Sequence, residues 1–348
     1  MSRILIAVLN WGMGHASRSL PLIEGAIDLG WDIDIASSGD AMVWLKSRLK
    51  NNEQVTFFEK PGANIRYSRH FTMLAIASQT PKLLKSIYEE RQWTRDHLQK
   101  RSISKIFSDN CYGVHHPDIP SLLMTHLLKF PVSNALSPFA QIIIKKLVAQ
   151  FDGIWVPDNP KGSNSIAGCL TSKSIHPNTT FIGLLSRLKP VKLTADAPLV
   201  GLVSGPEPHR TIMENALRKW MELQGERGLI LAGKPGGGKS EKNNITTLYD
   251  PSDEEISKAI CGSKTLICRS GYTTLLDLAS LGKRAILIPT PGQREQELLS
   301  KLWAKEFGFA QCTQKDLENM RIPEISGIAP KSKGNKVAIN ELAAWLKN

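Results

Sequence analysis

The chain alternates between short apolar runs and longer segments in which apolar residues recur every three or four positions. Residues 3–10 (RILIAVLN) form a continuous apolar run, residues 15–31 have apolar side chains at helical spacing, and residues 32–37 (DIDIAS) form a second run. Gly12 and Gly14 separate the first run from the helical segment. A strand, a glycine-rich turn, a helix and a second strand make a βαβ unit. This order predicts a parallel, doubly wound sheet for the N-terminal half.

The same alternation continues along the chain and predicts two α/β halves. Further strands are expected at residues 55–59, 105–109, 120–126, 153–157, 179–183, 199–205, 228–233, 264–269 and 284–290. Residues 187–199 are polar and contain prolines, which is typical of an interdomain linker. We therefore predict an α/β protein of two Rossmann-like, doubly wound parallel-sheet domains, residues 1–190 and 191–330. A cleft is expected at the carboxyl ends of both sheets.

Length and composition agree with two globular domains. The 348 residues are 41% hydrophobic and 22% charged, and no apolar run has the length of a signal peptide or a membrane span. We therefore expect a soluble, cytoplasmic protein. The five cysteines are scattered, without a C-x-x-C pair or the spacing of zinc ligands, which predicts free thiols and no metal site.

The net charge of +12 favours an anionic partner: a nucleic acid, an acidic membrane surface or a phosphorylated small molecule. Nucleic acid is not expected, because the basic residues are spread along the chain without a recognisable reading motif. Residues 70–101 mix apolar side chains with lysines and arginines. Two interpretations of this segment stay open: an amphipathic helix packed on its own domain, or a face that docks on an anionic membrane.

Residues 233–240 (GKPGGGKS) match the phosphate-binding pattern G-x-x-x-x-G-K-[ST] of nucleotide triphosphatases. That motif requires a strand before it and a helix after it, because the helix N-terminus faces the phosphates. A strand is predicted before the motif, but the polar residues after Ser240 show no helical pattern. We expect a flexible basic loop. A P-loop ATPase or a basic nucleic-acid-binding protein is kept as a distant alternative.

Residues 10–18 (NWGMGHASR) contain the first candidate for catalysis. His15 falls at the start of the first helix, at the edge of the sheet where ligands bind, and Gly12 and Gly14 allow close approach of the backbone. A helix N-terminus favours the neutral imidazole, which suits a general base. A histidine without catalytic duty is the alternative. A dinucleotide site is disfavoured, because Ser17 stands where G-x-G-x-x-G requires its third glycine.

The predicted strand at residues 105–109 delivers Asp109 and then Asn110 to the same edge. A carboxylate bound to one imidazole nitrogen fixes the tautomer of the ring and stabilises its charged form. Asp109 is therefore a candidate to orient His15. An aspartate that caps a helix or forms a turn is the equally open alternative.

Residues 268–303 form the most specific pattern. A predicted strand ends here, a tight turn follows, and the N–H groups at the start of the next helix make an anion site that fits a diphosphate. These residues are Arg269, Ser270, Gly271, Tyr272 and Thr273. Asp277, further along the helix, is placed to accept hydrogen bonds from ribose hydroxyls. The loop after the next strand carries amides and carboxylates that suit a sugar, whose hydroxyls both donate and accept. These are Gln293, Glu295, Gln296 and Glu297. A solvated loop is the alternative.

Together these patterns resemble the GT-B glycosyltransferases, in particular the group containing the peptidoglycan N-acetylglucosaminyltransferase and the monogalactosyldiacylglycerol synthases. The resemblance covers both halves of the chain: the Gly/His loop, the SGP of residues 204–206, and the RSG turn of residues 269–271 with its Gln-rich loop. It implies a UDP-sugar on the C-terminal domain and an acceptor on the N-terminal domain. It also implies that residues 331–348 form a helix that returns to the N-terminal domain.

The resemblance carries site residues with it. The implied contacts of the donor nucleotide are Gly205, Arg269, Ser270, Gly271, Tyr272, Thr273 and Asp277. The implied sugar contacts are Glu295, Gln296 and Glu297, and the acceptor-side loop comprises Gly12, Gly14 and Asn110. Asp277 is one methylene shorter than the glutamate usual in the family, so an indirect ribose contact or an altered base preference is expected. The P-loop match then becomes an accidental one, in a basic loop at the rim of the nucleotide-sugar site.

The sequence therefore predicts a transferase of hexosyl or N-acetylhexosaminyl groups that uses a UDP-sugar and an acceptor hydroxyl, with inversion and without a metal or cofactor. His15 would deprotonate the acceptor, Asp109 would orient His15, and the turn at Arg269–Thr273 would stabilise the departing diphosphate. A lipid-linked acceptor and a peripheral position on the inner face of the membrane are candidates. A nucleotide-sugar hydrolase on the same architecture is the nearest alternative.

Overall fold

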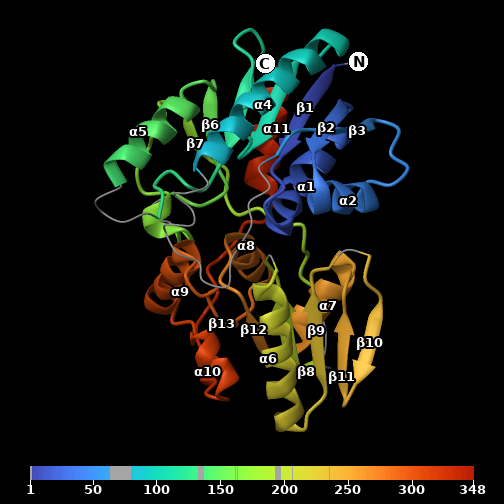
Figure 1. The fold of residues 1–348 in the computed structure, drawn as a ribbon, viewed down its shortest axis with the longest axis vertical. Coiled ribbons are helices and arrows are strands. Elements are labelled where there is room, and N and C mark those ends of the chain that lie inside the picture. The colour runs from blue at the N-terminus through green and yellow to red at the C-terminus, as the bar shows by residue number, and fades with distance from the viewer. Residues whose placement is uncertain are drawn as a thin grey trace. The chain divides into compact units, whose positions relative to one another are not determined.

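The computed structural model describes residues 2–62, 80–131, 137–160, 162, 164–192, 197–205, 207–234 and 236–348. These residues form two compact units (Figure 1). Unit 1 contains the described residues up to Leu185 together with Lys333–Asn348, and unit 2 contains the described residues of Ser186–Ser332.

Unit 1 is built on a parallel sheet. Its strands are β1 (Arg3–Val8), β2 (Asp32–Ser37), β3 (Val55–Glu59), β4 (Lys105–Asp109), β5 (Ser121–Met124), β6 (Gly153–Val156) and β7 (Thr179–Phe181). They lie in the order β3-β2-β1-β4-β5-β6-β7, and every pair is parallel. Each strand coincides with one of the predicted runs. The central strands β1, β4, β5 and β6 are buried almost throughout, as expected for strands covered on both faces.

Helices cover both faces of this sheet. They are α1 (Met13–Asp28), α2 (Gly39–Arg48), α4 (Thr80–Lys100), α5 (Ser137–Val148) and α11 (Lys336–Lys347), with a short 3-10 helix η1 (Gly168–Leu170). The helix α2 was not predicted. Alternate residues of β1 point to opposite faces, as the two-residue period of a strand requires. Ile4 and Ile6 pack with α1, α2 and α11, whereas Leu5 packs with Trp93 and Leu98 of α4.

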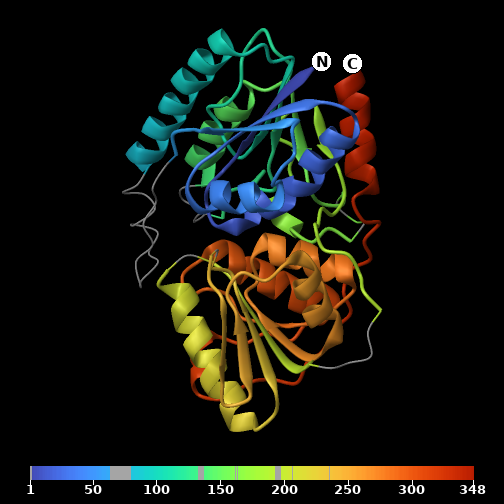
Figure 2. The same ribbon diagram turned by 90° about the vertical axis from the view of Figure 1, so that its right-hand side faces the viewer.

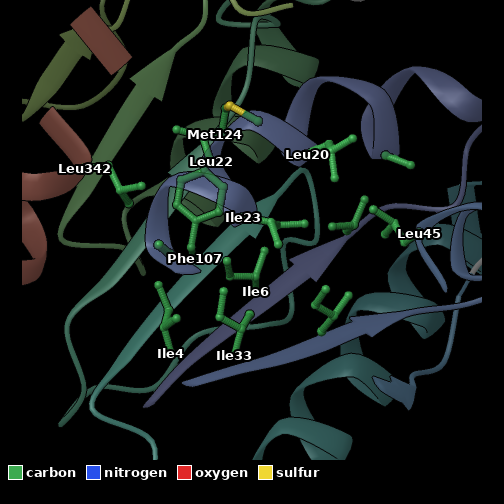
Figure 3. Packing of buried hydrophobic residues seen from close by; sticks show 14 of the residues in the cluster. Ile4, Ile6, Leu20, Leu22, Ile23, Ile33, Leu45, Phe107, Met124 and Leu342 are labelled. Carbon is green, nitrogen blue, oxygen red and sulfur yellow. The ribbon is translucent and has the colours of Figure 1, made fainter. Parts of the chain in front are cut away.

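The C-terminal helix α11 is part of the core of unit 1 (Figures 2 and 3). Leu342 packs among buried side chains that include Ile4 and Phe107 from the sheet. Gly25 of α1 lets α11 approach closely, because a Cβ added to it would lie 2.6 Å from Cδ1 of Ile339. Burying this apolar face joins the end of the chain to its first helix.

The helix α4 packs on the sheet through buried charged groups. Nε2 of His97 lies 3.0 Å from Oδ2 of Asp34 in β2, and Arg101, just after α4, donates to both oxygens of the same carboxylate. Burial alone would raise the pKa of Asp34, but the hydrogen bonds from His97 and Arg101 hold it below its usual value. A second buried pair joins Lys60 and Glu90 at 2.5 Å. The described part of residues 70–101 is thus anchored on its own domain. Residues 70–79 lie outside the described residues.

Unit 2 is built on a second sheet, in the order β10-β11-β9-β8-β12-β13. Its strands are β8 (Ala197–Val203), β9 (Gly228–Ala232), β10 (Lys239–Lys242), β11 (Ile245–Leu248), β12 (Ser263–Cys268) and β13 (Ile286–Leu287). Its helices are α6 (His209–Gln224), α7 (Asp253–Gly262), α8 (Tyr272–Leu281), α9 (Arg294–Phe307) and α10 (Gln314–Glu318). Every pair of strands is parallel except β10 with β11. Figure 2 shows α6 along one face of this sheet.

The hairpin of β10 and β11 was not predicted, and it decides the P-loop question. Asn243 and Asn244 have positive φ angles of 51° and 61°, as the two central residues of a type I′ hairpin turn require. Lys239 and Ser240, the last residues of GKPGGGKS, lie in β10. A strand therefore follows the glycine-rich loop, as the lack of helical pattern indicated, and no helix N-terminus is available there for phosphates.

Candidate functional site

The first group of candidate residues lies in unit 1, where α1 begins. Val8 is paired with Asp109, so β1 and β4 end side by side at the same edge of the sheet. Gly12, with a φ of 79°, is the N-cap of α1, and Gly14 and His15 lie in its first turn. Nδ1 of His15 lies 3.0 Å from Oδ1 of Asp109, and the side chain of His15 is 12% exposed. The contact expected from the sequence is therefore present.

The carboxylate of Asp109 is fully buried and is surrounded by donors. Nε of Arg18 donates to Oδ2 at 3.0 Å, a terminal nitrogen of Arg18 donates to Oδ1, and the hydroxyl of Ser19 donates to Oδ2 at 2.9 Å. Burial alone would raise the pKa of Asp109, but the charge of Arg18 and the contact with His15 lower it well below its usual range. Asp109 is therefore a permanent anion next to His15.

Sequence reasoning missed Arg18, Ser19 and His126 in this group. The second terminal nitrogen of Arg18 lies 3.0 Å from Nδ1 of His126, which is two residues beyond β5, the neighbour of β4. Two signals were available. Arg18 is three positions after His15, on the same helix face. His126 is a polar residue at the end of a predicted strand, as Asp109 is.

Asn110 follows Asp109 with a positive φ of 56°. Its N–H donates to the carbonyl of Met124 at 3.2 Å, and its Oδ1 is buried with no hydrogen-bond partner among the described residues. Buried polar atoms are almost always hydrogen-bonded, and exceptions concentrate at functional sites. Asn110 thus offers an acceptor beside the His15–Asp109 pair. Its assignment to the acceptor-side loop stays a proposal.

The second group lies in unit 2, at the ends of two neighbouring strands. The register of β8 and β12 places their last residues side by side, so the turns that follow them leave the same edge of the sheet. The first turn contains Gly205, with a φ of 105° and open space where a Cβ would lie. The second contains Gly271, the N-cap of α8, which is followed by Tyr272 and Thr273. This arrangement is a helix N-terminus of the kind that binds anions.

Arg269 supports this turn from inside the protein. Its side chain is fully buried and donates to the carbonyl oxygens of His209, Ile288 and Pro289 at 3.2, 3.4 and 3.2 Å, and to Oε1 of Gln314 at 2.8 Å. Burial lowers the pKa of Arg269 to about 10. The side chain thus links β12 to the start of α6, the end of β13 and α10, and the expected contact between this guanidinium and a diphosphate stays a prediction.

Ser270 and the predicted sugar-binding residues brace the same turn. The hydroxyl of Ser270 donates to the carbonyl of Gln296 at 2.8 Å, and Oε1 of Gln296 accepts from the N–H of Thr290 at 2.8 Å. Glu297 accepts from the N–H of Gly292 at 3.1 Å. These contacts hold the start of α9 beside the start of α8. Glu295 is half-buried in the first turn of α9.

Asp277 lies inside unit 2. Its Oδ1 accepts from the hydroxyl of Ser186 at 2.5 Å, and burial raises the pKa of its carboxyl group to about 6. The carboxyl group thus faces Ser186, and its expected ribose contact stays a prediction. Within the described ranges, no three His, Cys, Asp or Glu side chains come together as metal ligands do.

The raised pKa of Asp277 predicts a pH-dependent gain in stability for Asp277→Asn. The folded protein holds the proton of Asp277 more tightly than the unfolded chain does, in which the carboxyl group titrates near 3.8. The stability that the folded protein gains from this proton is therefore complete below about pH 4 and is lost as the pH rises through about 6. Asparagine can still accept from Ser186. At pH 8 the variant should unfold with a free energy higher by roughly 2–3 kcal/mol, with no difference near pH 4. Urea unfolding at both pH values measures this, and an equal difference at both would contradict it.

Comparisons with known proteins agree with this architecture. Residues 235–324, within unit 2, match the family model described as the Glycosyltransferase family 28 C-terminal domain. Along most of its length the chain is similar to the UDP-N-acetylglucosamine–N-acetylmuramyl-(pentapeptide) pyrophosphoryl-undecaprenol N-acetylglucosamine transferase of Buchnera aphidicola subsp. Baizongia pistaciae. The two sequences are 23% identical over 347 residues, covering 89% of this chain and 85% of the relative.

Solved structures share the fold. MurG of Acinetobacter baumannii superimposes with a TM-score of 0.57 at 14% identity, covering 99% of this chain and 100% of that one. Phytolacca americana UGT2, complexed with UDP-2fluoro-glucose and pterostilbene, gives 0.60 at 14% identity and covers 99% of this chain and 94% of that one. The two predicted parallel α/β sheets and the predicted resemblance are confirmed. The chain thus has the fold of the GT-B glycosyltransferases, and residues 235–324 of its second unit match the Glycosyltransferase family 28 C-terminal domain.

Proposed function

We propose that the protein transfers a sugar from a UDP-sugar to an acceptor hydroxyl, with inversion at the anomeric carbon. The observation that carries the proposal is the contact between His15 and the buried, ionised Asp109 at the carboxyl edge of the unit 1 sheet. With the proton of its Nδ1 donated to Asp109, the imidazole has a lone pair on Nε2 and can act as a general base. The match of unit 2 to a glycosyltransferase domain supports the choice of reaction.

The reaction follows from these groups. Nε2 of His15 takes the proton of the acceptor hydroxyl while the oxygen attacks the anomeric carbon of the donor. The bond between that carbon and the diphosphate oxygen breaks, and UDP leaves with the electron pair. One displacement of this kind inverts the configuration. Asp109 stabilises the imidazolium that forms.

The donor is assigned to unit 2. The N-terminus of α8 and the turn that contains Gly205 offer backbone N–H groups at one edge of the sheet, where a diphosphate gains from hydrogen bonds and from the helix dipole. Arg269 and Gln296 hydrogen-bond to the segments behind this edge. UDP is proposed as the nucleotide because the Buchnera relative is named for a UDP-sugar and the Phytolacca structure contains one.

A lipid-linked acceptor is proposed from the same relative, whose name includes pyrophosphoryl-undecaprenol. In the described part of the chain, no helix has the length and apolar character needed to cross a bilayer. The helix α5 nevertheless presents Phe139, Ile142 and Ile143 to solvent, at 68%, 55% and 45% exposure, next to exposed Lys145 and Lys146. Apolar and basic side chains on one helix suit an anionic membrane surface.

Replacing Phe139 and Ile142 together by serine should weaken binding to vesicles of phosphatidylglycerol and phosphatidylcholine by about tenfold or more, because each side chain gains on the order of 1–2 kcal/mol from partial burial in the interface. Flotation of purified protein with vesicles measures this. Val43→Ser on α2 is the matched control, since Val43 is an exposed apolar residue of the same unit. Equal flotation of the wild type and the double variant would refute the assignment of α5.

The donor assignment is tested by calorimetric titration with UDP, in EDTA and in magnesium, on the wild type and on Thr273→Glu and Thr273→Gln. A glutamate in the first turn of α8 stabilises the helix but competes with a bound diphosphate for the same positive end, so Thr273→Glu should lose UDP binding by at least about tenfold. Thr273→Gln should bind nearly as the wild type does. Equal binding by both variants would place UDP elsewhere.

The same preparations separate the remaining alternatives. ATP with magnesium should not bind, and Lys239→Ala should leave UDP affinity unchanged, because Lys239 lies in β10. Rapid release of UDP from UDP-sugars in the absence of any acceptor would favour a nucleotide-sugar hydrolase over a transferase.

A further inference from the structure

The guanidinium of Arg18 links three groups of the unit 1 site. Arg18 is 1% exposed and lies one turn after His15 on α1. It donates from Nε and one terminal nitrogen to the two oxygens of Asp109, and its other terminal nitrogen lies 3.0 Å from Nδ1 of His126. A planar fork held on both sides in this way has little freedom to move.

The contact with His126 defines the state of that ring. A guanidinium has only donors, so Nδ1 of His126 must accept, and the proton of this imidazole lies on Nε2. His126 is therefore neutral in this arrangement. Protonation of Nδ1 of His126 would place a second cation in contact with Arg18.

Nδ1 of His15 lies between two competing groups, 3.0 Å from Oδ1 of Asp109 and 3.0 Å from a terminal nitrogen of Arg18. The terminal nitrogen of Arg18 near His15 is the one that already donates to Oδ1 of Asp109, so we assign the proton of Nδ1 to its contact with Asp109 and the lone pair to Nε2. A doubly protonated His15 would face an anion and a cation at the same distance. The attraction of Asp109 for that second proton is therefore opposed by Arg18.

Among the described residues, the charges that lower the pKa of Asp109 are those of Arg18 and His15, and the Lys60 ammonium near Cys111 is paired with Glu90. Burial raises the pKa of Tyr112 to about 12, and it raises the pKa of the Cys111 thiol still further above its usual value. Both side chains are uncharged at neutral pH. Arg18 is thus the cation that balances Asp109.

We propose that Arg18 is a positioning residue that keeps His15 uncharged in the resting protein. By balancing the charge of Asp109, it lets the carboxylate orient the imidazole without drawing a second proton onto it. A neutral His15 is ready to accept a proton at neutral pH, whereas an Asp–His pair without such a cation would spend more of its time protonated. The inference uses the proposed function only in calling His15 the base.

The test is the titration of His15 by NMR in ligand-free, ¹⁵N-histidine-labelled protein, with its signals assigned by comparison with His15→Asn. In Arg18→Gln, which removes the charge, the titration midpoint of His15 should rise by about one pH unit or more. In Arg18→Lys, which keeps the charge but not the fork, it should rise by less than half as much. An unchanged midpoint in Arg18→Gln, or equal rises in both variants, would overturn the proposal.

A second variant covers the case in which Arg18→Gln does not fold, because it leaves a buried carboxylate without its cation. Asp109→Asn has no buried carboxylate to leave unpaired, so Arg18→Gln is added to it. The midpoint of His15 should rise by about one pH unit or more from Asp109→Asn to the double variant, and equal midpoints in the two would refute the role of Arg18. No sugar nucleotide enters these titrations. The expected shifts in a protein that transfers no sugar would therefore reject the proposed function and leave this inference standing.

Discussion

His15→Ala should lower kcat for sugar transfer by a factor of about 10²–10⁴, because the acceptor hydroxyl would lose the base that takes its proton. The affinity for UDP should stay within about twofold of the wild type, since the donor is assigned to unit 2. Asp109→Asn should also be slow, because an amide can present its N–H to the ring and favour the wrong tautomer. Release of UDP in the presence of an acceptor measures both variants.

The matched control is His176→Ala, which removes a histidine from a loop of unit 1, where its Nδ1 accepts from the N–H of Asn178. Its kcat should equal that of the wild type. If His15→Ala retained full activity while folded, the site at the start of α1 would not be the catalytic one, and the proposed mechanism would be wrong.

Arg269→Met should lower the free energy of unfolding by about 2–4 kcal/mol, because the carbonyls of His209, Ile288 and Pro289 and the amide oxygen of Gln314 would lose their donor inside the protein. Methionine fills much of the volume but donates nothing. Thermal and urea unfolding, followed by the fluorescence of unit 2 tryptophans, would measure the loss. Affinity for UDP should decline only as far as the folded fraction does.

Arg284→Met is the matched control, since Arg284 is an exposed arginine of the same unit, and its effect should stay within about 0.5 kcal/mol. The opposite result is equally informative. A stable Arg269→Met protein that no longer bound UDP would mean that the guanidinium turns to the ligand, as the sequence first indicated, and that its enclosed position is not the one used in binding.

Much of the fold was readable from local patterns. The strands β2, β3 and β4 have the bounds that their runs predicted. For β2 and β4 the reason is burial on both faces, which leaves a short, mostly apolar run in the sequence. The hairpin of β10 and β11 was not predicted, because its strands are short, largely polar and lie at a sheet edge. Its turn, however, carried a signal in Asn243 and Asn244, two residues that tolerate the positive φ angles of a two-residue hairpin.

The candidate site was readable only in part. The sequence indicated that His15 begins a helix and that Asp109 ends a strand. Because the carboxyl ends of parallel strands lie at one edge of a sheet, both residues were predicted to lie there. Arg18 and His126 completed the group only when the order β1-β4-β5 set three strand ends side by side. That order depends on pairings between distant segments, and no local period encodes it.

The sequence by itself determined the two α/β halves, the glycine-rich turns and the residue types at the strand ends, because two-residue and 3.6-residue periods are properties of neighbouring positions. Only the tertiary structure decided what each polar residue does. His15 and Arg269 both lie next to strand ends, but His15 stays partly exposed beside an anion, whereas Arg269 is enclosed by carbonyl groups from α6 and from the residues after β13. Whether a charged side chain faces a ligand or the interior depends on the atoms that distant segments place around it.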